Sequence, residues 1–184
     1  MRLVLRRRRQ AIGRARRNHC ERRAAAHLLR WRHVRRARRV AVYLSVHSEL
    51  ATPVLIRSLQ RRGCEVWVPR TRGPREMGFA CLRPGARLRR DALGLPRPAR
   101  DGALRRARAF DLIVLPLLGF DGDGHRLGNG AGYYDRALAC RRKVRRPLLV
   151  GYAYAVQEAA EIPRDPWDVR LDAVVTEHGL RRFR

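Results

Sequence analysis

Five short apolar runs are spaced along the chain from residue 40 onward, and they constrain the fold more than any other feature. Each run is five to seven residues long, and several carry β-branched residues at their ends. Runs of this length and composition are typical of strands that are buried on both faces of a sheet. The runs occupy residues 40–46, 64–68, 110–116, 148–153 and 171–176.

The segments between the first runs carry helix signals. Thr52 suits the N-cap of a helix and Pro53 its first position, while Gly63 is placed to end that helix. A second helix is expected from about residue 132 to residue 142. Strands that alternate with helices predict βαβ units, and hence a mostly parallel sheet flanked by helices on both faces.

Glycine and proline positions indicate where some of these elements end. We expect residues 77–82 to form a further strand at the sheet edge, and Pro69 to end the run at 64–68. Residues 83–102 hold several glycines and prolines and are expected to be mostly irregular. The run at 171–176 is expected to be the last strand.

The first 39 residues differ from the rest of the chain because they contain sixteen arginines and a single acid, Glu21. Apolar residues recur at helical spacing from Leu5 to Ala15 and from Ala24 to Trp31, which predicts two helices with a break near residues 17–20. The expected architecture is α/β: one Rossmann-like, three-layer domain over residues 1–184, with two N-terminal helices.

The net charge of +27 admits two explanations, because 42 of the 43 basic residues are arginine and only Lys143 is a lysine. One is an electrostatic surface for nucleic acid or another polyanion. The other, which the near-absence of lysine favours, is a bias toward arginine spread over solvated faces.

Cysteine usage and hydropathy bear on location. The four cysteines form no CxxC pair and have no accompanying histidine cluster, which argues against a zinc site and favours reduced thiols in the cytoplasm. No stretch approaches the ~20 apolar residues of a membrane span. The cysteines are Cys20, Cys64, Cys81 and Cys140.

A glycine-rich stretch at residues 119–135 separates a predicted buried strand from a predicted helix. In open α/β sheets, ligands bind at such positions. Bare backbone N–H groups beside a helix N-terminus can hold an anion, Arg126 can pair with phosphate oxygens, and Asp135 can hold a phosphate-bound Mg²⁺. The glycine spacing alone matches no standard phosphate loop and leaves a plain flexible loop as an equal alternative.

Residues 126–136, Arg-Leu-Gly-Asn-Gly-Ala-Gly-Tyr-Tyr-Asp-Arg, resemble the signature of the 5-formyltetrahydrofolate cyclo-ligase family. Other similarities to this family follow in the same order along essentially the whole chain. They lie at residues 2–6, 44–52, 68–69, 77–79, 151–157, 163, 167–168 and 172–177.

The resemblance implies an enzyme that uses ATP and Mg²⁺ to convert 5-formyltetrahydrofolate to 5,10-methenyltetrahydrofolate, with release of ADP and phosphate through an imino-phosphate intermediate. Such chemistry requires positioning and charge neutralisation more than a nucleophilic side chain. The implied partners are these small-molecule substrates, for a monomer with no membrane association. The alternative is a polyanion- or nucleic-acid-binding protein on the same scaffold, although the chain lacks a series of stacking aromatic residues.

The resemblance also implies residue roles. Arg126 and Tyr133 are the implied catalytic residues, and Asp135 and Asp168 the implied magnesium ligands. The implied folate-binding residues are Leu44, Glu49, Met77, Asn129 and Tyr133. The implied nucleotide-binding residues are Arg2, Arg6, Arg126, Leu127, Gly128, Asn129, Gly130, Ala131, Gly132, Tyr133 and Tyr134.

Four positions depart from the family's usual residues. Arg2 replaces a lysine, Arg97 replaces a common glutamate, and Asn129 and Ala131 stand where arginine, lysine or glycine are common. These differences bear on phosphate contacts and on efficiency more than on the kind of reaction.

Overall fold

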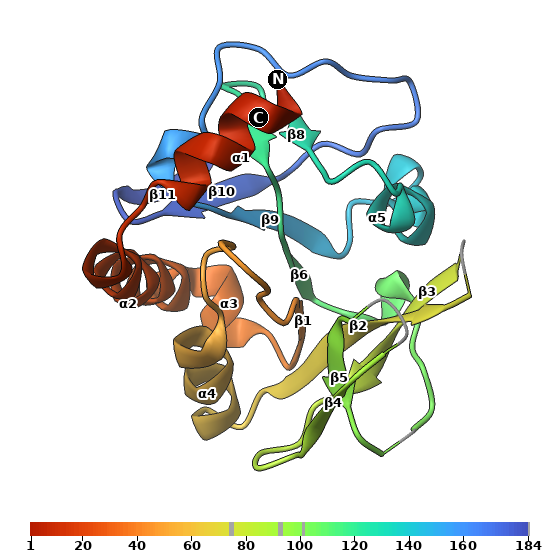
Figure 1. Ribbon diagram of the computed structural model, residues 1–184. Helices are drawn as coiled ribbons and strands as arrows, with labels where there is room; N and C mark the ends of the chain where they lie inside the picture. Colours follow the sequence, from red (N-terminus) through yellow and green to blue (C-terminus); the bar gives the residue numbers. More distant parts are fainter. Residues whose placement is uncertain (74–75, 92–93, 101, 184) are drawn as a thin grey trace.

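The computed structural model describes residues 1–73, 76–91, 94–100 and 102–183, and within them seven strands form one sheet (Figure 1). The order across the sheet is β11-β10-β9-β6-β1-β2-β3. The five inner strands are parallel, and both edge strands run antiparallel to their neighbours. Their bounds are β1 Arg39–Val42, β2 Glu65–Arg72, β3 Glu76–Cys81, β6 Leu112–Leu115, β9 Leu148–Tyr152, β10 Ala173–Thr176 and β11 Gly179–Arg182.

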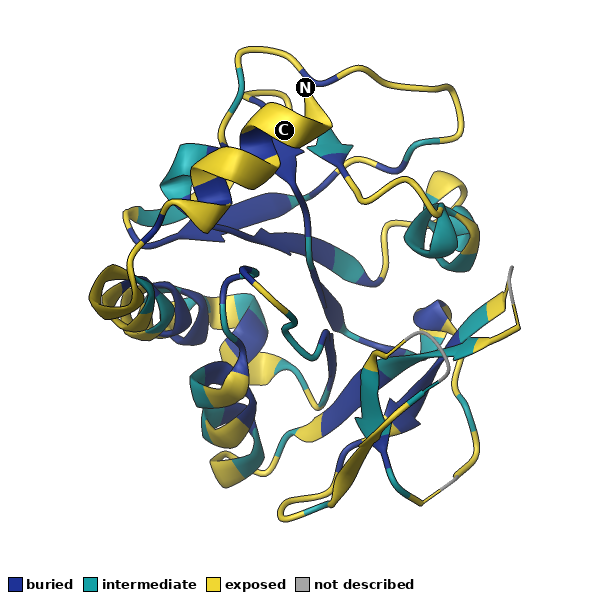
Figure 2. Ribbon diagram, in the orientation of Figure 1, coloured by how far each residue is buried: buried dark blue, intermediate teal, exposed yellow. Residues whose placement is uncertain are grey.

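The helices cover both faces of this sheet, which confirms the predicted α/β class. On one face, α2 (Arg14–Arg30), α3 (Arg32–Arg36) and α4 (Pro53–Arg61) pack on alternate strand residues. The other face is covered by the 3₁₀ turns η1 (Ala107–Ala109) and η2 (Ala139–Arg142) and by α5 (Tyr133–Ala137). The inner strands are therefore buried on both sides, as Figure 2 shows.

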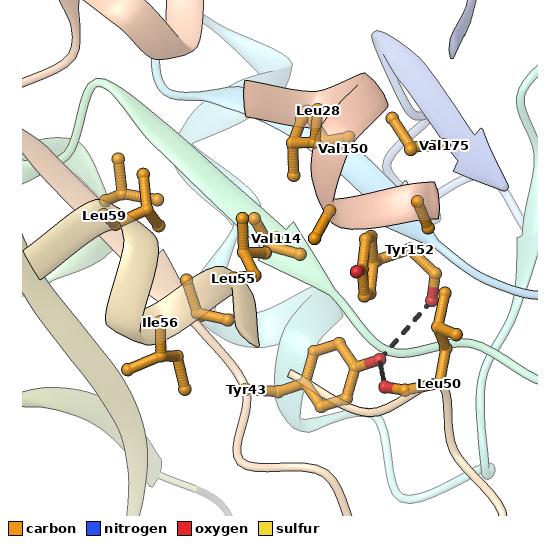
Figure 3. Close-up of a cluster of buried hydrophobic side chains, with 14 of the residues drawn as sticks. Leu28, Tyr43, Leu50, Leu55, Ile56, Leu59, Val114, Val150, Tyr152 and Val175 are labelled. Atoms are coloured by element: carbon orange, nitrogen blue, oxygen red, sulfur yellow. Dashed lines mark hydrogen bonds between the residues drawn. The ribbon is translucent and has the colours of Figure 1, made fainter. Parts of the chain in front are cut away.

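The core beneath α2 and α4 is continuous with the end of β1. Leu28, Leu55 and Val114 meet there with the neighbouring apolar side chains drawn in Figure 3. The Tyr43 hydroxyl donates to the Leu50 carbonyl oxygen at 2.6 Å, so a buried polar atom has a partner and the chain that leaves β1 is held in place.

The remaining elements are short. The N-terminal helix α1 (Arg2–Gln10) lies above the carboxyl ends of the parallel strands (Figure 1). Two small hairpins join β4 (Leu88–Arg90) to β5 (Pro96–Pro98) and β7 (Gly119–Phe120) to β8 (Arg126–Leu127), and η3 (Ala155–Gln157) follows β9. Among the described residues, no helix has both the length and the apolar composition needed to cross a bilayer.

The predicted break in the N-terminal segment was wrong. Residues 17–20 lie inside α2, and the chain instead breaks at residues 11–13, where Gly13 is the extended N-cap of α2. Arg17 explains the difference, because its guanidinium donates to the carbonyl oxygens of Ile12 at 2.7 Å and Gln10 at 3.0 Å. It satisfies carbonyls that the end of α1 leaves open.

Two predicted strand ends were also wrong. Strand β2 continues through Pro69, which pairs with Phe79 of β3. Pairing of β2 with β1 ends at Trp67, so the proline, which has no N–H, interrupts no hydrogen bond to β1. Strand β10 is followed by β11, since Gly179 adopts a positive φ and permits a tight hairpin.

The predicted bounds were confirmed for α4, whereas the second expected helix is not continuous. Helix α4 begins at Pro53 and is followed by Gly63 with positive φ, as expected, but the Thr52 hydroxyl donates to the Tyr43 carbonyl oxygen at 2.9 Å instead of capping the helix. The helix expected over residues 132–142 is divided into α5 and η2. The irregular segment at 83–102 contains the β4–β5 hairpin.

The sheet reverses its direction of winding between β1 and β6. The chain goes from β1 through α4 to β2 on one side, and from β6 through α5 to β9 on the other. The segments that leave the carboxyl ends of β1 and β6 therefore diverge and leave a crevice between them, which is where open α/β folds bind ligands.

Candidate active site

A cleft of about 990 Å³ lies at this crevice. The segments that leave β1 and β6 form its floor, and residues 126–135, called the glycine loop below, run along it. One end is bordered by the start of α1 and by residues 163–168. The other end is bordered by β2, β3 and the β4–β5 hairpin. Its lining includes every residue predicted for the site except Arg6.

Two glycines of the glycine loop hold conformations that other residues rarely adopt. Gly130 has a φ of +98° and Gly132 a φ of +64°. A Cβ at Gly132 would also come within 2.7 Å of Nη1 of Arg136. The loop therefore exposes backbone to the cleft. Arg2 approaches the same loop from α1, with its Nε donating to the Gly128 carbonyl oxygen at 3.2 Å.

Arg126 and Asp135 form an ion pair across the loop. The Arg126 guanidinium donates to Oδ1 of Asp135 and to the carbonyl oxygen of Val169. The Arg126 side chain is 6% exposed and that of Asp135 is 29% exposed. Arg126 is therefore held from two sides, while the carboxylate of Asp135 still faces the cleft.

Asp168 lines the same end of the cleft as Asp135 and accepts a hydrogen bond from the Asp165 backbone N–H at 2.9 Å. Among the described residues, no group of three or more His, Cys, Asp or Glu side chains is placed to hold a metal ion. Mg²⁺ in nucleotide sites is usually bound by one or two carboxylates together with phosphates and water. The two aspartates supply that kind of donor set.

Asp121 ties the glycine loop to the wall that carries Asp168. Its buried carboxylate accepts hydrogen bonds from the backbone N–H groups of His125 at 2.9 Å and Ile162 at 3.1 Å, and contacts Nδ1 of His125 at 3.0 Å. Nε2 of His125 lies 3.1 Å from Nη1 of Arg164, which lines the cleft. The two walls at this end are therefore held together.

Glu49 lies at the other end, on the chain that leaves β1. Its Oε2 accepts a hydrogen bond from the Val46 N–H at 3.0 Å, which closes a turn over residues 46–49, called the Glu49 turn below. Burial raises the pKa of Glu49, and the Val46 N–H and the nearby Arg9 guanidinium oppose that shift. The side chain is thus a desolvated carboxyl group facing the cleft.

The other predicted folate-binding residues surround Glu49. Leu44 and Met77 are half-buried in the lining, and the Tyr133 hydroxyl lies 3.4 Å from the Gly73 carbonyl oxygen, between the glycine loop and β2. Phe79, two residues after Met77, is a core residue packed edge-on against Phe110.

The structure separates one predicted residue from the cleft and brings in others. Arg6 is exposed on α1 and is not part of the lining. Buried Arg9, from the same helix, is close enough to influence the charge of Glu49. Arg9 could have been found from its helical spacing with Leu5 and Ile12, which are both buried. Lining residues that sequence reasoning did not assign to the site include Tyr43, Thr71, Leu117, Arg164 and Asp165.

Comparisons with known proteins identify the family and the fold of the chain. Residues 1–177 match the model of the 5-formyltetrahydrofolate cyclo-ligase family. The chain is 34% identical to a 5-formyltetrahydrofolate cyclo-ligase of Escherichia coli, over 94% of this chain and 96% of that protein. The Aquifex aeolicus 5,10-methenyltetrahydrofolate synthetase structure superposes with a TM-score of 0.83 at 31% identity, over 98% of this chain and 89% of that one. A Mycoplasma pneumoniae synthetase, 22% identical with 96% of each chain covered, shares the fold with a TM-score of 0.77.

Proposed function

The chain belongs to the 5-formyltetrahydrofolate cyclo-ligase family, and from this premise we propose that it converts 5-formyltetrahydrofolate and ATP to 5,10-methenyltetrahydrofolate, ADP and phosphate. One observation carries the proposal beyond the family match. The glycine loop runs between an end of the cleft with cationic and carboxylate groups and an end with a desolvated carboxyl group. Two different substrates can meet along such a loop.

ATP is assigned to the end near α1. The backbone of Gly128, Gly130 and Gly132 approaches the phosphates closely, and Arg2 neutralises their charge from above the loop. Arg126, fixed by Asp135 and Val169, presents its remaining charge to the transferred phosphoryl group. Leu127, Asn129, Ala131, Tyr133 and Tyr134 complete this wall, and Arg6 is assigned an approach to the outer phosphate oxygens from solvent.

Asp135 and Asp168 are proposed to hold Mg²⁺, which when bound screens the negative charge of the phosphates. Because Asp135 already pairs with Arg126, its carboxylate is held in one orientation before any ion arrives. This preorganisation reduces the reorganisation needed on binding.

The folate is assigned to the end near β2 and β3. Glu49, when ionised, accepts hydrogen bonds from N–H groups of the pterin, and Leu44 and Met77 contact the flat faces of its ring. Tyr133 and Asn129 border both substrates, so the pterin and the γ-phosphate meet at the middle of the glycine loop.

The proposed reaction has two steps, a phosphoryl transfer and a ring closure. The formyl oxygen attacks the γ-phosphorus, the bond to ADP breaks, and an imino-phosphate forms. N10 of the folate then attacks the former formyl carbon, the C–O bond breaks with release of phosphate, and N10 loses its proton. The protein positions N10 and neutralises phosphate charge, so no nucleophilic side chain is required.

The test is to mix purified protein with 5-formyltetrahydrofolate and Mg-ATP and to follow the near-ultraviolet absorbance of the methenyl product. We expect absorbance to rise only when both substrates and Mg²⁺ are present. Folded protein that forms no product and binds neither substrate would refute the proposal. A monomeric state and a cytoplasmic location stay predictions, which size-exclusion chromatography and cell fractionation can test.

A further inference from the structure

Helix α1 buries a charged side chain. Arg9 is only 6% exposed, although it lies on the same helix as several exposed arginines. Its Nε donates to the Ser48 hydroxyl at 3.1 Å, and its Nη1 lies 3.5 Å from the Leu117 carbonyl oxygen. Burying a guanidinium group is unfavourable unless partners compensate it. A stable buried Arg9 therefore points to a purpose served by its charge or its hydrogen bonds.

The two partners of Arg9 belong to the two segments that diverge at the crevice. Ser48 lies on the Glu49 turn, which leaves β1, and Leu117 follows β6. The Arg9 side chain thus joins both segments. Displacement of Arg9 would loosen the Glu49 turn, which is otherwise held by the bond from the Val46 N–H to the Glu49 carboxylate and by the Tyr154 hydroxyl at the Glu49 carbonyl oxygen.

The charges around Glu49 come from several elements. Arg9 on α1 and His47 on the turn itself are the cationic groups, of which His47 is exposed. Tyr43 after β1, Tyr134 on α5 and Tyr154 after β9 contribute hydroxyl groups, and that of Tyr154 lies 3.4 Å from the Glu49 carbonyl oxygen. Arg9 is thus the buried cation that faces this carboxyl group.

We propose that Arg9 is a positioning residue for folate binding: it fixes the Glu49 turn through Ser48 and Leu117, and its charge favours the ionised carboxylate of Glu49. The role rests on the proposed function, because it assumes that Glu49 receives the pterin. Arg9 acts through Glu49 and touches neither substrate, since it is absent from the cleft lining.

The test compares Arg9→Met, Arg9→Lys and a matched control, Arg8→Met, which removes an exposed arginine from the same helix. Arg9→Met is expected to raise KM for 5-formyltetrahydrofolate by about tenfold, the effect of losing a charged hydrogen bond, and to change KM for Mg-ATP much less. Arg8→Met is expected to match the parent protein in both.

The pH profile separates positioning from simple structural support. The Arg9 charge lowers the pKa of Glu49 against the effect of burial. Without that charge the pKa rises, so the ionised carboxylate is lost at a higher pH as the solution is acidified. The acid limb of kcat/KM for the folate should therefore move to higher pH in Arg9→Met and return toward its original position in Arg9→Lys.

Kinetics of Ser48→Ala and NMR titration of Glu49 test the same role independently. If Arg9→Met does not fold, Ser48→Ala removes one hydrogen-bond acceptor and keeps the charge, and should raise the folate KM without moving the acid limb. If the parent protein proves inactive, the proposed function fails, but NMR titration of Glu49 still decides this inference. Equal Glu49 pKa values in the parent and Arg9→Met proteins, or equal losses for both substrates in Arg9→Met, would overturn it.

Discussion

Asp135 lies between the Arg126 guanidinium and the proposed Mg²⁺ position. It accepts a hydrogen bond from Arg126 and faces the cleft, where Mg²⁺ is proposed to bind. A carboxylate with this double contact orients the guanidinium and still attracts a cation, because one oxygen atom can serve each partner. The sequence predicts both residues for the site, but their pairing depends on the path of the chain between them and becomes evident only in the folded loop.

Asp135→Asn is the substitution that isolates this role. The amide keeps the shape but loses the charge for both Arg126 and Mg²⁺, so we expect KM for Mg-ATP to rise by about tenfold or more, at ~1.5–3 kcal/mol for a charged contact. The folate KM should change by less than about twofold on the same reasoning. Steady-state kinetics over a magnesium titration measures both.

Glu158→Gln is the matched control for this experiment. Glu158 also pairs with an arginine, Arg181, at 2.9 Å, but it is exposed and lies outside the cleft. It should leave both KM values near those of the parent. Unchanged turnover of Asp135→Asn at every magnesium concentration would remove Asp135 from the metal site.

Helix α1 borders the cleft and is the element that we expect to close it. It is attached through a small apolar cluster in which Leu5, 2% exposed, packs against Leu127 and Ile162. Leu5 lies between Arg2, which contacts the glycine loop, and Arg9, which contacts the Glu49 turn. One leucine therefore holds in place two cations that serve opposite ends of the site.

Leu5→Ala tests this attachment. Removal of a buried leucine side chain costs about 2–5 kcal/mol where the cavity does not close. Because α1 packs on the rest of the fold through this small cluster, we expect part of this cost to appear as local detachment of the helix, with KM rising for both substrates and a lower thermal midpoint. Val4→Ala, at an exposed neighbouring position, should change neither. If Leu5→Ala lowers the midpoint but leaves both KM values unchanged, α1 does not close the cleft.

Elements defined by local signals could be predicted from the sequence. Helix α4 has its proline at the start and its glycine after the end, and the strand at 112–115 is a continuous apolar run. Features that depend on a distant partner could not. The extension of β2 past Pro69 requires β3, and the break before α2 depends on Arg17 reaching back to the end of α1.

The whole molecule carries far more positive charge than two anionic substrates require. Twelve exposed arginines lie on α1 to α3 alone, at positions 2, 6, 7, 8, 14, 16, 22, 23, 30, 32, 35 and 36. Figure 2 shows these helices with exposed residues on one side and buried residues on the other. This arrangement fits solvated charge around an enzyme core, and no comparison with known proteins points to a nucleic-acid-binding role.

Such a surface should still attract polyanions through counterion release alone. We expect single-stranded RNA to bind with a dissociation constant that rises by about three-hundredfold between 50 and 200 mM salt for some six phosphates contacted, reaching roughly 10⁻⁴ to 10⁻⁶ M at physiological salt. Fluorescence anisotropy at a series of salt concentrations measures the slope. Replacing Arg7, Arg8, Arg14 and Arg22 by glutamine should make the slope shallower and leave folate turnover unchanged, because none of the four lines the cleft.

A different outcome would favour the alternative function. Specific recognition would hold RNA at roughly 10⁻⁸ M or tighter in physiological salt and would depend on its sequence. Combined with absent folate turnover, that result would make the cleft a remnant and the basic helices the working surface. With turnover present, RNA binding that weakens to the nonspecific level at physiological salt means that the surface charge serves at most to concentrate anionic substrates near the cleft. The cations that line the cleft, Arg2 and Arg126 among them, then select among these substrates.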